Sequence, residues 1–295
     1  MTLHGPWMLQ VPFASAPEIP FTEEITQAVA GYTILIAPGP APYNRFIVKE
    51  LETIDEVRDR FSALKRGILL ASLSVGGCGI RIKDDLLVFE DATQLPNEEL
   101  SQPFACPQGM SLARLVIKVG EPVFQLPLVL PSVTHGLEIG IASNFGVEAL
   151  QDPRIALACD LYTGSFFEKS FAAQFIALIT VLEVLKDRDS VSLEVIRLID
   201  DWLSQIDRLE DVEANSFRGQ LERMKQLSIS RGIGRMIARH LGEDRAREIQ
   251  ELYGIRSTLV HDGKIPADLE NRLQRAQCIV RELLISILRG SRLPS

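Results

Sequence analysis

The sequence predicts an α+β N-terminal domain followed by an all-α helical bundle, and three observations support this fold class. The chain has 295 residues, and at roughly 100–200 residues per domain this length fits two domains. Hydrophobic residues make up 46% of the chain and charged residues 24%, the balance of a folded protein rather than a disordered one. Helical periodicity dominates from Phe166 onward, where Pro266 is the only proline before Pro294. We therefore expect one domain over residues 1–150 and a second over residues 151–295.

Short strand-like segments, separated by Gly, Pro and Asp turns, fill most of the first domain. We expect strands at residues 32–37, 45–48, 79–83, 86–90, 115–119 and 123–130. One helix is predicted over 53–72, and Thr53 with Glu56 forms a capping box at its start. No phosphate-binding loop, catalytic triad or metal cluster is recognisable in this half of the sequence. For residues 1–150 we therefore expect only that they bind a partner protein or a ligand, whose kind the sequence does not specify.

The second domain reads as a series of helices joined by short turns. We expect these helices at residues 168–186, 192–209, 214–227, 232–241, 244–262 and 267–288. Between residues 171 and 185 the only ionisable residue is Glu183. Because a helix that is apolar all round belongs at the centre of a bundle, this helix should be central and Glu183 should need a partner. The alternative is that Glu183 reaches the surface near the end of the helix.

The charge distribution argues against a uniformly basic nucleic-acid-binding protein. The net charge is −8, and residues 1–150 hold 10 basic and 17 acidic residues. Residues 151–295 are nearly balanced, with 21 basic and 22 acidic residues, and 17 of the 21 basic residues are arginine. Arginine suits planar contacts with phosphate better than lysine does, although surface helices also use arginine freely. A local basic face in the second domain is therefore compatible with the composition.

Cysteine and histidine usage predicts neither a metal site nor a cofactor. The four cysteines are far apart and form no CxxC pair, and the chain has only four histidines. Widely spaced cysteines fit a reduced, cytoplasmic protein. The N-terminal residues lack the pattern of a signal peptide, and no apolar stretch has the length of a membrane span. We therefore expect a cytoplasmic protein without membrane association.

The segment 248–263 contains the most informative pair of residues, Arg256 and His261. On a helical wheel of about 100° per residue, five apolar or aromatic residues lie within about 60° of Arg256. These residues are Ile249, Leu252, Tyr253, Leu259 and Val260. A charge in the middle of an apolar face must be paired or must line a functional cleft, and Glu183 is the obvious partner. The alternative is a buried structural arginine, with His261 serving only as a helix cap near Gly263.

Two segments together resemble the HEPN family. The stretch from Tyr253 to Gly263, YGIRSTLVHDG, is similar to the Arg-x4-6-His signature of HEPN domains. Residues 172–185, AAQFIALITVLEVL, resemble the conserved helix of the ApeA-like branch of that family. The resemblance covers roughly residues 160–290 and does not extend to the acidic first half.

The resemblance implies a small helical bundle that forms a homodimer. In active HEPN members, two Arg-His motifs meet across the dimer and form a metal-independent ribonuclease site. By this resemblance, Arg256 would hold the scissile phosphate of RNA and His261 would take part in proton transfer at the ribose 2′-OH or the leaving 5′-oxygen. Glu183 and Ser257 would support them, Ser257 standing where many active members have Asn, Asp or His. Such proteins often belong to stress or antiviral defence systems.

A stripe of arginines offers a surface for RNA. Arg231, Arg235 and Arg239 recur every four residues, which places them on one face of the predicted helix. Residues 218–247 hold eight Lys or Arg and three Asp or Glu, so this segment is locally basic. A solvated helix face balanced by neighbouring acidic residues is the alternative. For the whole chain, RNA binding with possible endoribonuclease activity competes with two other functions: a non-catalytic HEPN-fold interaction or scaffold module, and a ligand sensor acting through residues 1–150.

Overall fold

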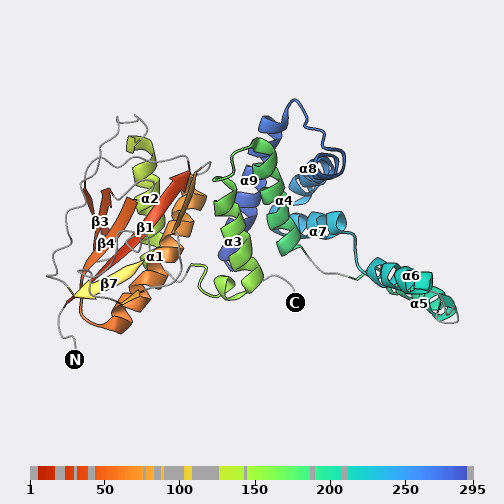
Figure 1. Cartoon of the computed structure of the whole chain (residues 1–295), viewed down its shortest axis with the longest axis horizontal. Coiled ribbons are helices and arrows are strands. Elements are labelled where there is room, and N and C mark those ends of the chain that lie inside the picture. The colour runs from red at the N-terminus through yellow and green to blue at the C-terminus, as the bar shows by residue number, and fades with distance from the viewer. Residues whose placement is uncertain are drawn as a thin grey trace.

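The computed structural model of the chain describes residues 6–16, 24–29, 32–38, 44–75, 78–82, 88–89, 103–107, 126–142, 145–186, 190–206 and 212–290. Within these ranges a part that combines a sheet with two helices is followed by a part that is helical (Figure 1). The predicted α+β part followed by a helical part is therefore confirmed. None of the described helices combines the length and the apolar character needed to cross a membrane.

The sheet is mostly antiparallel and is centred on its first strand. Its strands are β1 (Trp7–Ala16), β2 (Ile25–Val29), β3 (Tyr32–Pro38), β4 (Asn44–Leu51), β5 (Gly79–Ile82), β6 (Val88–Phe89) and β7 (Phe104–Pro107). The strand order is β2-β3-β4-β1-β7-β6, and β5 pairs with the second half of β1. Only β6 and β7 pair in parallel among the described strands. Residues 7–13 of β1 are buried on both faces, which makes β1 the structural centre of the sheet.

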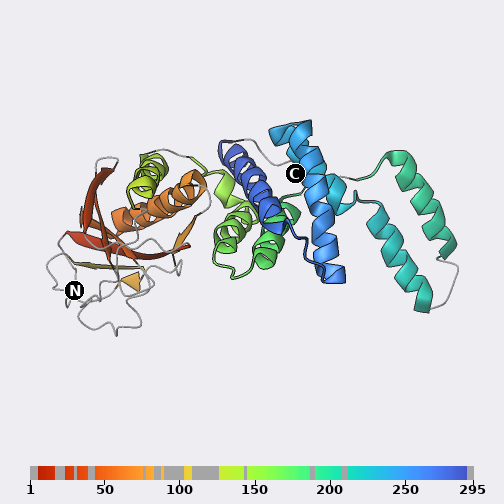
Figure 2. The same ribbon diagram turned by 90° about the horizontal axis from the view of Figure 1, so that it is seen from above.

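Two helices, α1 (Ile54–Val75) and α2 (Leu126–Ala142), cover the same face of the sheet (Figure 2). The core between these helices and the sheet contains Phe13 and Phe46, whose rings stack with centroids 4.2 Å apart. Helix α1 begins as the sequence predicts, because the Thr53 hydroxyl accepts a hydrogen bond from the backbone N–H of Glu56 (3.1 Å). The Glu56 carboxylate in turn accepts from the backbone N–H of Glu52 (2.8 Å). The two bonds satisfy backbone donors at the start of the helix.

Glycines allow α1 and α2 to approach each other closely. A methyl group added at Gly136 of α2 would lie 2.5 Å from the Cα atom of Ala71 in α1. A methyl group added at Gly140 would overlap the backbone of Gly67. The contact therefore depends on the absence of side chains at these positions.

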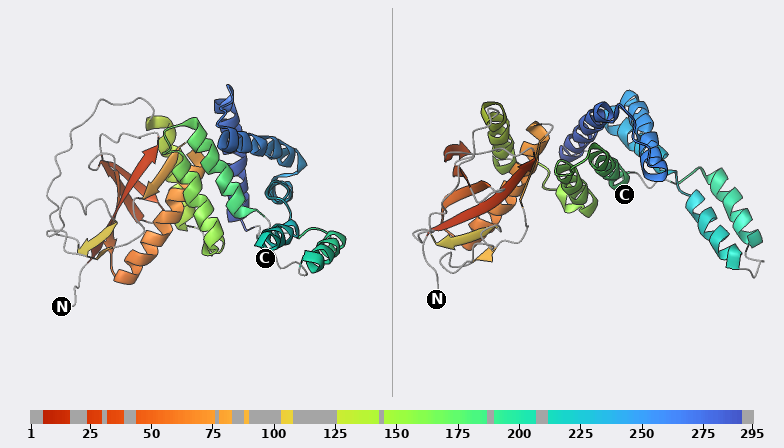
Figure 3. Two further views of the ribbon diagram at one scale, coloured as in Figure 1. Left: turned by 45° about the vertical axis from the view of Figure 1, so that its right-hand side comes forward. Right: turned by 45° about the horizontal axis from the view of Figure 1, so that its top comes forward.

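The helical part is built around α4. Its helices are α3 (Pro153–Ser165), α4 (Phe171–Leu185), α5 (Leu193–Ile206), α6 (Val212–Met224), α7 (Ile229–Leu241), α8 (Glu243–Asp262) and α9 (Leu269–Leu288), preceded by a short 3-10 turn, η2 (Ala149–Gln151). Helix α4 packs against α3, α7, α8 and α9. The pair α5–α6 packs mainly within itself and stands apart from the other helices (Figures 1 and 3). The prediction that the helix over residues 171–185 is central is confirmed.

Several segments differ from the sequence prediction. Residues 126–130 belong to helix α2, so the strand expected over 123–130 is wrong there; a short apolar run fits a buried helix as well as a buried strand. The strand expected at 115–119 lies outside the described residues. Helix α3 was not expected, although Asp152 caps it by accepting from the backbone N–H of Arg154 (2.8 Å) and Pro153 occupies its first turn.

The buried side chains form two clusters that meet near the end of α1. The first lies between the sheet, α1 and α2, and the second fills the helical part. Leu73 of α1 belongs to the second cluster, and Phe145 and Leu150 pack against it as well. The expected domain boundary between residues 150 and 151 stays a prediction, since residues on both sides of it contact the helical core.

We predict that Gly136→Ala destabilises the protein by about 1–3 kcal/mol, because the added methyl group would force α1 and α2 apart. Thermal unfolding followed by circular dichroism would measure the loss. The matched control is Gly254→Ala inside α8, where the added methyl group meets no atom within 4 Å. This control should stabilise the protein by about 0.5–1 kcal/mol, the helix preference of alanine over glycine. An unchanged melting temperature for Gly136→Ala would contradict the close helix contact.

Candidate functional site

Helix α8 places Arg256 at the edge of its buried face. The buried positions of this helix include Ile249, Leu252, Ile255 and Leu259, which follow one side of the helix. Val260 was expected on that face but is 47% exposed, so the prediction that Arg256 lies in its middle is wrong. The buried face is displaced towards Ile255, and the Arg256 side chain therefore keeps 26% of its surface exposed.

Arg256 and Glu183 form the ion pair that the sequence predicts. Nε of Arg256 lies 3.5 Å from Oε1 of Glu183, without the geometry of a hydrogen bond. The Tyr253 hydroxyl donates a hydrogen bond to the same oxygen of Glu183 (3.0 Å). Burial, and next the contact with the Glu183 carboxylate, raise the pKa of Tyr253. Glu183 thus joins α4 to α8 through two partners.

The guanidinium of Arg256 keeps donors available. Its contact with Glu183 uses the Nε side, and its two terminal nitrogens make no hydrogen bond with any residue that the structure describes. A guanidinium has five N–H donors in a planar fork, and two parallel bonds from the fork suit a phosphate or a carboxylate. Arg256 can therefore bind an anion while Glu183 holds it in place.

His261 and Ser257 are both exposed on α8. His261 lies in the last turn of the helix, which ends at Gly263 in the left-handed conformation (φ 64°) as expected. Neither side chain makes a hydrogen bond or ion pair with the described residues. Ser257 follows Arg256 directly but points to solvent, so no contact in the structure gives it a supporting role.

Within one copy of α8, Arg256 and His261 do not face each other. At a rise of about 1.5 Å and a rotation of about 100° per residue, the two positions lie about 7.5 Å apart along the axis and about 140° apart around it. The two side chains therefore leave the helix in different directions. A site that uses both groups on one phosphate needs a second copy of the helix to complete it.

The arginine stripe lies on α7 as predicted. Arg231, Arg235 and Arg239 are all exposed, whereas Ile233, Met236 and Ile237 on the other side are buried. Helix α7 packs directly against α8, and a methyl group at Gly234 of α7 would collide with the side chain of Gln250 in α8. The basic surface of α7 and the helix that carries Arg256 and His261 are therefore neighbours.

An ion-pair network that the sequence analysis missed fixes α8 to α9. Glu248 of α8 accepts from Arg275 Nε of α9 (2.7 Å) and from Arg245 Nη1 (2.9 Å). Arg245 also donates to Glu282 of α9 (3.0 Å). The hydrogen bond from Arg275, followed by that from Arg245, lowers the pKa of Glu248. The partners on α9 are far from α8 in the sequence, so no local pattern could have indicated these contacts.

Within the described residues no group of His, Cys, Asp or Glu side chains could hold a metal ion. Cys78, Cys159 and Cys278 carry free thiols. The chain matches no known protein-family model, no curated protein and no solved structure. The resemblance to HEPN domains therefore stays a prediction.

We predict that Glu183→Ala lowers the free energy of unfolding by about 1–3 kcal/mol, because it leaves a half-buried guanidinium and the Tyr253 hydroxyl without their acceptor. Glu183→Gln keeps an acceptor for Tyr253 and should lose less. Urea unfolding of the purified variants would measure both changes. The control is Glu251→Ala, whose side chain is 74% exposed and lies 3.9 Å from Arg275, and it should change stability by less than about 0.5 kcal/mol. Wild-type stability for Glu183→Ala would show that the contact is not a structural link.

Proposed function

We propose that the protein is a HEPN-like RNA-binding protein that cleaves RNA without a metal ion. The observation that carries the proposal is the partly exposed Arg256, which Glu183 holds in place and which shares α8 with the exposed His261. The exposed arginine stripe on α7 supports it, since this surface lies next to α8 and can follow the phosphates of a single strand. A cytoplasmic location and a role in stress or defence belong to the same proposal.

The proposed reaction is an internal transfer of the phosphate. The ribose 2′-oxygen attacks the adjacent phosphorus and loses its proton to a base, while the bond from phosphorus to the 5′-oxygen breaks and this oxygen gains a proton. The products are a 2′,3′-cyclic phosphate and a 5′-hydroxyl end, and no water or metal ion is consumed. Arg256 would stabilise the charge that develops on the phosphate, and His261 would transfer a proton at the 2′-oxygen or the 5′-oxygen.

A homodimer would complete the site. The reaction needs a proton acceptor, a proton donor and a cation at one phosphate, whereas one α8 directs Arg256 and His261 apart. Two copies of α8 facing each other would bring the arginine of one protomer near the histidine of its partner. The same arrangement would supply two histidines, one for each proton transfer.

A second candidate function, a non-catalytic interaction module, is favoured by the α5–α6 pair. This pair stands apart from the bundle (Figure 3), and it exposes large apolar side chains. Leu193 is 72% exposed, Phe217 57% and Trp202 41%. Exposed apolar surfaces of this kind often mark contacts with other proteins. Under this alternative, Arg256 and Glu183 form only a structural pair.

We predict that the purified protein cleaves single-stranded RNA in the presence of excess EDTA and leaves 2′,3′-cyclic phosphate ends. His261→Ala should abolish cleavage and change RNA affinity by less than about threefold, because it removes a proton-transfer group but no phosphate contact. Denaturing gels would measure cleavage and fluorescence anisotropy would measure binding. His135→Ala on α2 is the matched control, since His135 is also exposed but lies in the sheet part. If wild-type and His261→Ala proteins both bind RNA and neither cleaves it, the enzyme proposal fails.

We predict that the triple substitution Arg231→Gln, Arg235→Gln and Arg239→Gln weakens RNA binding and its dependence on salt. Each lost phosphate contact should reduce the slope of log K against log salt by about 0.7 for a single strand. Titrations at several KCl concentrations would measure this slope. The control is Arg58→Gln on α1, whose side chain is 63% exposed and lies in the sheet part. An unchanged slope for the triple variant would remove the α7 stripe from the RNA surface.

A further inference from the structure

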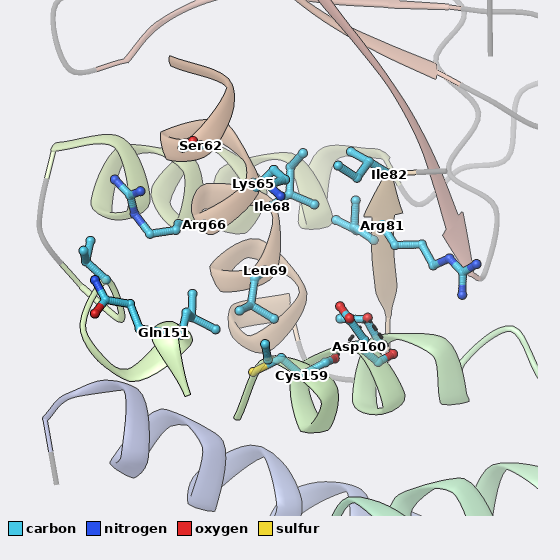
Figure 4. A pocket seen from close by; sticks show the side chains of 15 residues that line it. Ser62, Lys65, Arg66, Ile68, Leu69, Arg81, Ile82, Gln151, Cys159 and Asp160 are labelled. Atoms are coloured by element: carbon cyan, nitrogen blue, oxygen red, sulfur yellow. Dashed lines mark hydrogen bonds between the residues drawn. The ribbon is translucent and has the colours of Figure 1, made fainter. Parts of the chain in front are cut away.

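A cavity of about 860 Å³ lies where the sheet part meets the helical part (Figure 4). Helix α1 and strand β5 line one side of it, and η2 and α3 line the other. Its size falls within the range of small-molecule sites, roughly 300–1,000 Å³. The cavity is separate from Arg256 and His261, neither of which lines it.

The lining carries an excess of positive charge. Lys65 and Arg66 of α1 and Arg81 of β5 face a single acidic residue among the lining residues, Asp160 of α3. Nε of Arg66 is buried and has no hydrogen-bond partner among the described residues. Burial lowers the pKa of Arg66. The two terminal nitrogens of Arg66 make no hydrogen bond with the described residues either, and they are the donors that an anionic ligand in the cavity would reach.

The polar groups are divided between the two ends of the cavity. Figure 4 shows Arg66 on the same side as Gln151, whereas Arg81 and Asp160 lie towards the opposite side. Between them the wall is mostly apolar and includes Ile68 and Leu69, with Lys65 beside Ile68. The arrangement fits a ligand with an anionic group at one end, a flat or apolar body, and hydrogen-bond donors at the other end. The Asp160 carboxylate would accept from those donors.

We propose that this cavity binds a nucleoside phosphate, with its phosphate at Arg66. The base would lie against the apolar wall, and an amino or hydroxyl group of the nucleoside would donate to Asp160. Nucleoside phosphates combine these three features, since they have a charged phosphate, a planar ring and several polar N–H or O–H groups. The walls come from both sides of the junction, so the bound ligand would contact α1 and α3 at once.

Isothermal titration calorimetry on the full chain would test the proposal. The probes are the four common ribonucleoside 5′-monophosphates and triphosphates, with adenosine and inorganic phosphate as the two halves of the ligand. We expect at least one nucleotide to bind once per chain and to raise the melting temperature, whereas inorganic phosphate and adenosine bind much more weakly. Arg66→Gln should weaken nucleotide binding about tenfold or more, as expected for one hydrogen bond between charged groups.

Two further variants distinguish a loss of nucleotide binding at the cavity from a loss of folding and from a change at the arginine stripe of α7. Asp160→Asn should also weaken nucleotide binding although it removes no positive charge, and Arg58→Gln on the same helix as Arg66 should leave binding unchanged. Circular dichroism and the melting temperature without ligand would show that each variant is folded. The proposal is overturned if no nucleotide binds, or if inorganic phosphate binds as tightly as the nucleotides. It is also overturned if the substitutions of Arg231, Arg235 and Arg239 abolish nucleotide binding while Arg66→Gln does not.

Discussion

The burial of α4 is the constraint on which the helical part depends. Phe175, Leu178, Ile179 and Leu182 are completely buried, so other helices must cover this helix along most of its length. Glu183 is the only ionisable group in α4, and the covering helix α8 must therefore provide partners for it. Arg256 and Tyr253 do so from one turn of α8. The packing of the bundle and the position of the candidate site thus follow from the same requirement.

The junction between the sheet and the helices depends on a close approach of β5 to α3. A methyl group at Gly79 would lie 2.6 Å from the carbonyl oxygen of Thr163, so only glycine allows this contact. The Ser72 hydroxyl holds β5 against α1 through the backbone N–H (2.7 Å) and carbonyl (2.9 Å) of Ile80. These contacts fix one wall of the cavity relative to the other. Helix α3, which carries Asp160, also packs against α4, so the junction is continuous with the core that holds Glu183.

Local patterns predicted the elements whose signals are contained in one segment. The helices α4 and α8, the cap of α1 at Thr53 and the end of α8 at Gly263 all follow from periodicity or capping residues. Strand β1 was missed because both of its faces are buried, which removes the alternation that marks a half-exposed strand. The Glu248 network and the cavity were missed because their residues come from separate elements. The Glu183–Arg256 pair could be predicted because Glu183 is the only charge on the apolar helix α4 and needs a partner, and Arg256 follows the apolar positions of α8 closely enough to provide one.

The geometry of that pair bears on whether Arg256 has a role beyond structure. An arginine that serves only to neutralise a carboxylate commonly presents two parallel N–H groups to it, because this gives the strongest contact. Arg256 instead approaches Glu183 through Nε at 3.5 Å, and Tyr253 provides the hydrogen bond that this carboxylate oxygen accepts. Oε1 of Glu183 thus accepts its hydrogen bond without the terminal nitrogens of Arg256. A positioned, partly exposed cation with unused donors is suited to bind an anion that arrives from solution, such as the phosphate of an RNA chain.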